Sequence, residues 1–124
     1  LLNFHKRKNG LATICVYKNS NTNPKSIVVF NKDGRIKSFA ERPQNVTQRS
    51  VWSNASLYVL EPEIFDYIPK EGPSDFGRNV FPKILKAGKI LYAYKQTGYF
   101  LDIGNMVKLK QAEKDFRKGK FLCC

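Results

Sequence analysis

The sequence has 124 residues, and 22 lysines and arginines against 10 aspartates and glutamates give a formal net charge of +12. This length allows one domain with a single core, and 42% hydrophobic with 26% charged residues argues against global disorder. No apolar stretch approaches the ~20 residues of a membrane span, so we expect no membrane partner. The chain starts at Leu1 within a predicted helix, which favours a piece of a longer protein.

The excess positive charge is spread along the predicted helices, as in Lys108, Lys110, Lys114 and Lys118. Such runs are typical of solvated surface, whereas a nucleic-acid interface concentrates charge and interleaves it with exposed aromatic rings. Most aromatic residues lie in apolar patterns that predict burial: Phe30, Phe39, Tyr58, Phe65, Phe81, Tyr92, Tyr94 and Phe100. We therefore expect no specific nucleic-acid partner and a milder attraction for phosphate-bearing small molecules.

The first half of the chain predicts one helix and four strands. A helix over residues 1–8 ends at Asn9 and Gly10, which favour a left-handed stop. Residues 11–17 predict a buried strand, and a polar loop follows over 19–25. Strands over 27–31 and 35–39 flank Asp33 and Gly34, a pair typical of a hairpin turn. Residues 41–53 predict a long exposed loop, and 54–60 predict the fourth strand.

The second half alternates helices with strands. Pro62 suits the start of a helix over 63–68. Ser74 can cap a helix over 75–87, which Pro82 divides. Strands over 90–94 and 99–103 precede a basic helix over 106–118. The whole pattern predicts an α/β fold with a mixed β-sheet and flanking helices.

The sequence has few cysteine and histidine residues that could act as nucleophiles or metal ligands. Cys15 lies in an apolar run and is expected to be a small buried hydrophobe, and the vicinal pair Cys123 and Cys124 rarely forms a disulfide. This usage favours a reducing, cytoplasmic compartment. The single histidine, His5, is expected on the surface of a basic helix end, which argues against a Ser-His-Asp arrangement.

Polar residues instead lie at the ends of predicted strands, where open α/β sheets bind ligands. Glu41 can accept hydrogen bonds from sugar hydroxyls and Arg42 can bind a phosphate bidentately, although such a pair is also common in turns. Asn54 opens a strand with small residues that leave room for a ligand. Asp102, two residues before Gly104, can bind an Mg²⁺ that bridges phosphates. A purely structural turn at Asp102 is an equal alternative.

Several short segments occur in an order that indicates a protein family more specifically than any one segment does. These are D-G-R at 33–35, F-A-E-R-P at 39–43, N-A-S-L-Y-V-L-E-P at 54–62, D-F at 75–76, V-F-P-K-I-L at 80–85 and G-Y-F-L-D-I-G at 98–104. The series resembles the sugar-phosphate nucleotidyltransferase family over nearly the whole chain. It is similar in style to the mannose-1-phosphate or heptose-1-phosphate guanylyltransferases and to the glucose-1-phosphate group.

The resemblance implies that residues 1–124 are the sugar-phosphate-binding, C-terminal part of a Rossmann-like nucleotidyltransferase domain. In that family a sugar 1-phosphate attacks a nucleoside triphosphate and gives a nucleotide sugar and pyrophosphate. Glu41 occupies the position of the family's glutamate that binds sugar hydroxyls. Arg42 occupies the position of the family's catalytic lysine, which contacts the substrate phosphate. Asn54 occupies the position of the family's asparagine that lies beside the sugar, and Asp102 occupies the position of an aspartate that binds the catalytic Mg²⁺.

The sequence also departs from the family pattern. Arg42 replaces lysine, Ser56 replaces glycine, and Lys25-Ser26 stand where an aromatic-glycine pair is common. The family's G-G-x-G-T-R nucleotide loop and N-G-D aspartate do not occur in these 124 residues, so we expect the chain to be inactive by itself. The alternative is a degenerate homologue that binds sugar phosphate or acts as a regulatory or assembly module. Exposed sheet edges make a homo-oligomer a further expectation.

Overall fold

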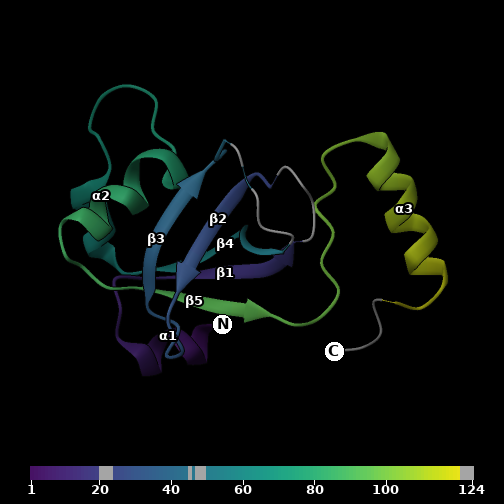
Figure 1. Cartoon of the computed structure of the whole chain (residues 1–124), viewed down its shortest axis with the longest axis horizontal. Coiled ribbons are helices and arrows are strands. Elements are labelled where there is room, and N and C mark those ends of the chain that lie inside the picture. The colour runs from purple at the N-terminus through teal and green to yellow at the C-terminus, as the bar shows by residue number, and fades with distance from the viewer. Residues whose placement is uncertain (20–23, 45, 47–49, 121–124) are drawn as a thin grey trace.

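The computed structural model describes residues 1–19, 24–44, 46 and 50–120. The predictions for Cys123, Cys124 and parts of the two long loops lie outside these residues. In chain order the elements are α1 (Leu2–Lys8), β1 (Ala12–Asn19), β2 (Ser26–Phe30), β3 (Ile36–Glu41), β4 (Val51–Leu60), the 3₁₀-helix η1 (Pro62–Tyr67), the π-helix η2 (Phe76–Val80), α2 (Phe81–Lys86), β5 (Leu91–Gln96) and α3 (Met106–Arg117). Figure 1 shows the β2–β3 hairpin crossing over the strands β1, β4 and β5.

The central sheet is mixed, as the alternation of elements predicts. Its strand order is β4-β1-β5, with β1 antiparallel to β4 and parallel to β5. The hairpin β2–β3 forms a second, antiparallel sheet that pairs Ser26 with Glu41. Its turn contains Gly34 at a φ of 85°, the left-handed conformation that glycine adopts without steric cost. The sequence therefore predicts this turn correctly.

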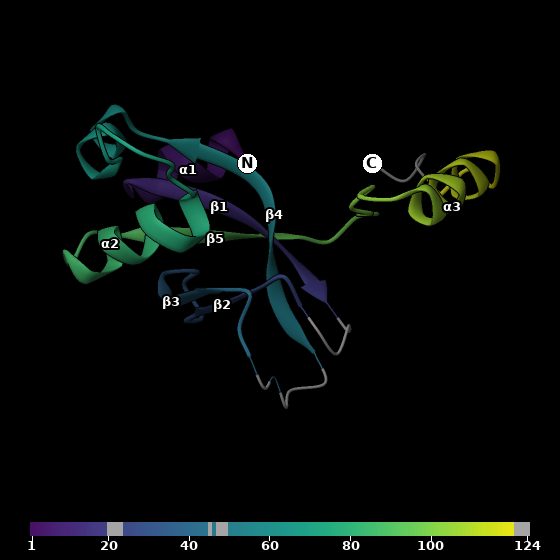
Figure 2. The ribbon, with the colours of Figure 1, turned by 90° about the horizontal axis from the view of Figure 1, so that it is seen from above.

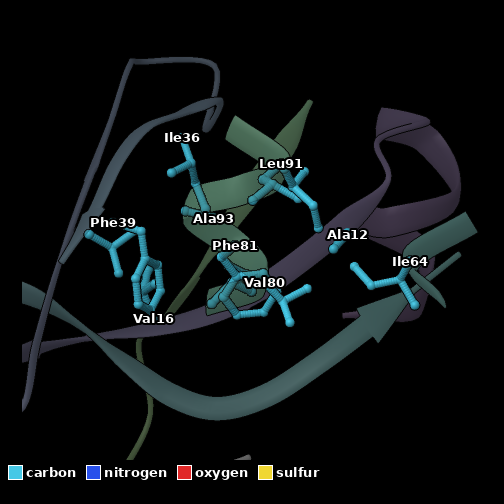
Figure 3. Packing of buried hydrophobic residues seen from close by; sticks show 12 residues of the cluster. Ala12, Val16, Ile36, Phe39, Ile64, Val80, Phe81, Leu91 and Ala93 are labelled. Atoms are coloured by element: carbon cyan, nitrogen blue, oxygen red, sulfur yellow. The ribbon is translucent and has the colours of Figure 1, made fainter. Parts of the chain in front are cut away.

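The core lies between the central sheet, the hairpin and α2. Figure 3 shows side chains of β1, β3, β5 and α2 meeting in one cluster around Phe81. The Phe81 ring is fully buried, and its centroid lies 5.4 Å from that of Phe39 and 5.2 Å from that of Tyr58. These contacts join α2 to the end of β3 and to β4, so the core fixes the two strands that carry candidate site residues.

Several predicted element boundaries are wrong. Residues 99–103 do not form a strand, and β4 begins at Val51 rather than at residue 54. The predicted helix over 75–87 divides into η2 and α2 because Pro82 has no N–H with which to continue the helical hydrogen bonds. Asp75, not Ser74, caps it, accepting a hydrogen bond from the backbone N–H of Arg78 at 2.8 Å.

Burial differs from the prediction at three side chains. His5 is buried rather than at the surface, and its ring hydrogen-bonds to Thr13 and Glu61. Phe65 is 73% exposed on η1, and Phe100, which follows β5 outside any strand, is 36% exposed. The periodicity of a short apolar run does not reveal which face meets the core. Cys15 is buried, as predicted.

The helix α3 lies apart from the sheet, beyond the extended segment that follows β5 (Figure 2). The Tyr99 hydroxyl donates a hydrogen bond to Asp115 at 2.8 Å and ties the helix to this segment. Hydrogen bonds from Gln111, Lys120 and Tyr99 lower the pKa of Asp115 to about 2. Within the described part of the chain, no helix has the length and apolar character to cross a membrane.

Candidate functional site

A cavity of about 190 Å³ lies where β1, β2, β3 and β4 meet the segment after β5. Its lining residues are Tyr17, Lys25, Ser26, Glu41, Asn54, Ala55, Ser56, Phe100 and Asp102. Three of the four residues predicted from the sequence, Glu41, Asn54 and Asp102, therefore line one cavity. The fourth, Arg42, follows Glu41 directly but is exposed and does not line it.

A bulge in β4 builds one wall of this cavity. Ile14 pairs with Tyr58 and Val16 pairs with Asn54, so three residues of β4 lie opposite Cys15 of β1. A bulge bends its strand and redirects the side chains that it carries. Ser56, at the centre of the bulge, has a φ of 57°, a left-handed conformation that disfavours residues with a Cβ. The glycine of the family pattern would adopt it without that cost.

The Asn54 side chain holds the bulge in shape. Its Oδ1 accepts a hydrogen bond from the Ser56 backbone N–H at 2.9 Å, and its Nδ2 donates to the Tyr58 hydroxyl at 2.7 Å. An amide oxygen has two lone pairs and an amide nitrogen two N–H groups. Asn54 therefore keeps one acceptor and one donor position for a ligand while it supports the cavity wall.

Buried serines join the hairpin to β4. The Ser53 hydroxyl donates to the Ser26 carbonyl oxygen at 2.7 Å, and the Ser26 hydroxyl accepts from the Asn54 backbone N–H at 2.8 Å. Both serines are almost fully buried, where an unpaired polar group would be costly. Ser26 thus stands where the family pattern has glycine, and its hydroxyl forms a direct hydrogen bond to the β4 backbone. The sequence does not predict this role.

Glu41 ends β3 and lies against the first turn of η2. A Cβ added to Gly77 would lie 2.7 Å from Glu41 Oε2, so the glycine leaves the space that the carboxylate occupies. Partial burial raises the pKa of Glu41 and nearby Asp75 adds to this, while Arg42, Arg78 and Lys25 act in the opposite direction. The carboxylate therefore lies among three cationic side chains.

Arg42 connects the two strands of the hairpin at the cavity rim. Its backbone N–H donates to the Lys25 carbonyl oxygen at 2.7 Å, and its φ of 48° is left-handed. This conformation turns the chain away from the sheet directly after Glu41. The guanidinium is exposed next to the cavity, where a phosphate could approach it.

Asp102 forms an ion pair with Lys25 across the cavity. Lys25 Nζ lies 2.7 Å from Asp102 Oδ2, and the two side chains are 72% and 41% exposed. The hydrogen bond from Lys25 lowers the pKa of Asp102, and the same bond raises the pKa of Lys25. Phe100 stacks on Tyr17 with ring centroids 4.4 Å apart and so holds the segment that carries Asp102 against β1.

The residues around Asp102 determine how the predicted Mg²⁺ could bind there. Among residues 1–19, 24–44, 46 and 50–120, no three or more His, Cys, Asp or Glu residues are grouped so that they could hold a metal ion. Mg²⁺ is usually held by one or two carboxylates, with phosphate oxygens and waters completing its shell. Asp102 fits such an ion as a single carboxylate ligand.

Comparison with known proteins identifies the family. The Nucleotidyl transferase family matches residues 1–119, and the chain belongs to this family. It is 32% identical over 114 residues to the UTP–glucose-1-phosphate uridylyltransferase of Synechocystis, covering 87% of this chain and 28% of that protein. It is 31% identical over 122 residues to the mannose-1-phosphate guanylyltransferase catalytic subunit beta of Drosophila melanogaster, covering 98% and 30%.

Solved structures show the fold. The crystal structure of HddC from Yersinia pseudotuberculosis superposes with a TM-score of 0.69 at 18% identity, over 93% of this chain and 48% of HddC. A second structure of HddC, complexed with GMP-PN, gives a TM-score of 0.67. The α/β fold of nucleotide-diphospho-sugar transferases is thereby confirmed. The chain spans about half of HddC and less than a third of the two relatives above.

Proposed function

We propose that this chain is the sugar-phosphate-binding part of an enzyme that joins a sugar 1-phosphate to a nucleoside triphosphate, giving a nucleotide sugar and pyrophosphate. The observation that carries the proposal is the shared cavity of Glu41, Asn54 and Asp102, with Arg42 beside it. These residues come from three separate segments of the chain. Their meeting brings carboxylate and amide groups that can bind sugar hydroxyls next to a guanidinium that can bind a phosphate.

Each residue has a role that its chemistry supports. Glu41 accepts hydrogen bonds from sugar hydroxyls, and Asn54 offers its remaining amide positions to the same sugar. Arg42 binds the phosphate, because a guanidinium presents two parallel N–H groups to phosphate oxygens. Catalysis by such a site consists of positioning and charge stabilisation.

The family resemblance implies Mg²⁺ as the cofactor, and we propose Asp102 as the residue of this chain that binds it. The ion, when bound, would neutralise phosphate charge. Asp102 provides one carboxylate, and the nucleotide phosphates and the remainder of the domain would provide the other ligands. We also propose a cytoplasmic location, because the nucleoside triphosphate that the reaction consumes is present there.

A binding titration of the chain with glucose 1-phosphate and mannose 1-phosphate tests the sugar-phosphate site. Replacing both Glu41 and Arg42 by alanine should weaken binding by about tenfold or more, since a charge-assisted hydrogen bond contributes about 1.5–3 kcal/mol. The matched control is Lys70→Ala with Glu71→Ala, another adjacent cation and anion, both exposed and outside the cavity. Equal affinity of the two double variants would overturn the proposal.

Self-association stays a prediction. β4 is an edge of the three-stranded sheet, and its Leu57 is 56% exposed. An exposed strand edge offers unpaired backbone groups to another chain. Light scattering at high protein concentration tests this, and a monomeric mass would contradict it.

A further inference from the structure

Lys25 lines the cavity, and the family resemblance implies no role for it. It stands immediately before β2, where an aromatic residue is common in the family. Its ammonium nevertheless forms an ion pair in the cavity, at 2.7 Å from Asp102 Oδ2. The two residues are 77 positions apart in the sequence, so only the folded chain brings them together.

The surroundings of Lys25 favour an anionic ligand. Its backbone carbonyl accepts the N–H of Arg42, which fixes the position of the Lys25 backbone beside the residue proposed to bind phosphate. An ammonium has three N–H donors, and one of them faces Asp102. The remaining donors belong to a side chain that is 72% exposed. They can therefore reach a ligand at the cavity without displacing protein groups.

The pairing also affects Asp102. A divalent cation and an ammonium repel each other, so the two cannot share one carboxylate oxygen at close range. A metal ion that binds Asp102 through Oδ2, the oxygen that Lys25 contacts, therefore displaces Lys25. The long lysine side chain then needs another anion, and the phosphate of a sugar 1-phosphate beside Arg42 is the anion that the proposed function brings into the cavity.

We propose that Lys25 is a second phosphate-binding residue of this site, held on Asp102 while the cavity is empty, and that it competes with a divalent cation for Asp102. The proposal rests on the proposed function. It predicts that the loss of Lys25 has opposite effects on the two ligands. Metal binding becomes tighter because no ammonium has to be displaced, and sugar-phosphate binding becomes weaker because one cationic donor is missing.

The test uses Lys25→Met in the full chain, with two separate titrations. Mn²⁺ alone serves as the divalent probe, followed by the electron spin resonance signal of the free ion and by the broadening of NMR signals near Asp102. Its affinity should rise about 1.4- to fivefold, because an exposed ion pair contributes about 0.2–1 kcal/mol. The affinity for glucose 1-phosphate, titrated without metal, should fall roughly three- to tenfold.

Two variants serve as controls. Lys37→Met removes the same charge from an exposed position of β3 outside the cavity, and it should leave both affinities within about a factor of two, since surface charges are largely screened. Combining Lys25→Met with Asp102→Asn should abolish the gain in Mn²⁺ affinity, which assigns the gain to Asp102. Far-UV circular dichroism checks that every variant is folded.

The outcomes separate this inference from the proposed function. If Lys25→Met binds glucose 1-phosphate as the wild type does while Glu41→Ala with Arg42→Ala loses it, Lys25 has no phosphate-binding role and the proposed function stands. An unchanged Mn²⁺ affinity in Lys25→Met overturns the competition. If the wild-type chain does not bind the sugar phosphate, the proposed function fails and the phosphate-binding role of Lys25 fails with it.

Discussion

Replacing His5 by alanine should destabilise this chain far more than a change on a helix surface. The His5 ring is buried, with Nδ1 2.8 Å from Thr13 Oγ1 and Nε2 2.8 Å from Glu61 Oε1. Alanine removes both hydrogen bonds and leaves the fully buried Thr13 hydroxyl without its His5 partner. Two hydrogen bonds at about 1 kcal/mol each and an unpaired buried hydroxyl at about 1–3 kcal/mol give a loss of about 3–5 kcal/mol.

Urea denaturation followed by far-UV circular dichroism measures this loss. Lys6→Ala is the matched control, because Lys6 lies on the same helix and is exposed, and it should change the unfolding free energy by less than about 0.5 kcal/mol. Combining His5→Ala with Thr13→Val completes a double-mutant cycle, and a coupling of about 1 kcal/mol is expected for residues in contact. A loss below about 1 kcal/mol for His5→Ala, similar to that of a surface variant, would refute the reasoning.

Three further predictions concern the cavity and α3. Ser56→Gly should raise the unfolding free energy by up to about 1 kcal/mol, because it relieves the left-handed φ of 57°; a destabilised variant in urea denaturation would contradict this. Gly77→Ala should displace Glu41, whose Oε2 would lie 2.7 Å from the new Cβ, and weaken glucose 1-phosphate binding by about tenfold in a titration; unchanged affinity would show that Glu41 does not need this space. In the folded chain the pKa of Asp115 is lowered to about 2 from an ordinary value of 3.8. Because this folded pKa lies below that of the unfolded chain, ionised Asp115 stabilises the folded chain. This stabilisation is complete above about pH 5 and is lost as the pH falls towards 2. The NMR signals of Tyr99 should change over the same pH range, and Asp115→Asn should remove this change with pH. The same change of the Tyr99 signals with pH in Asp115→Asn would contradict the prediction.

The sequence predicts the candidate site better than it predicts the burial of single side chains. The sequence places Glu41, Asn54 and Asp102 at the ends of predicted strands, and the three side chains line one cavity. The predicted strand over 99–103 is wrong, yet Asp102 still reaches the cavity because the Phe100 ring stacks on Tyr17. The roles proposed for these three residues stay predictions until binding is measured.

His5 shows why other features could not be predicted. The two residues that follow it, Lys6 and Arg7, are basic and exposed, a pattern typical of a helix surface. The residues that bury and pair it are Thr13 and Glu61, and Glu61 is 56 positions away. A local pattern carries no information about such a contact, because it forms only when β4 and α1 are both in place.

The sequence by itself determined the family, the alternation of helices and strands, and the hairpin turn at Gly34, because each follows from local chemistry or from the order of motifs. The tertiary structure alone decided how the cavity is built. The bulge at Ser56 depends on the register between β1 and β4, and the pair of Lys25 with Asp102 joins segments 77 residues apart. Register and long-range pairing are set by the packing of the whole core around Phe81, and no short segment of the chain specifies that packing.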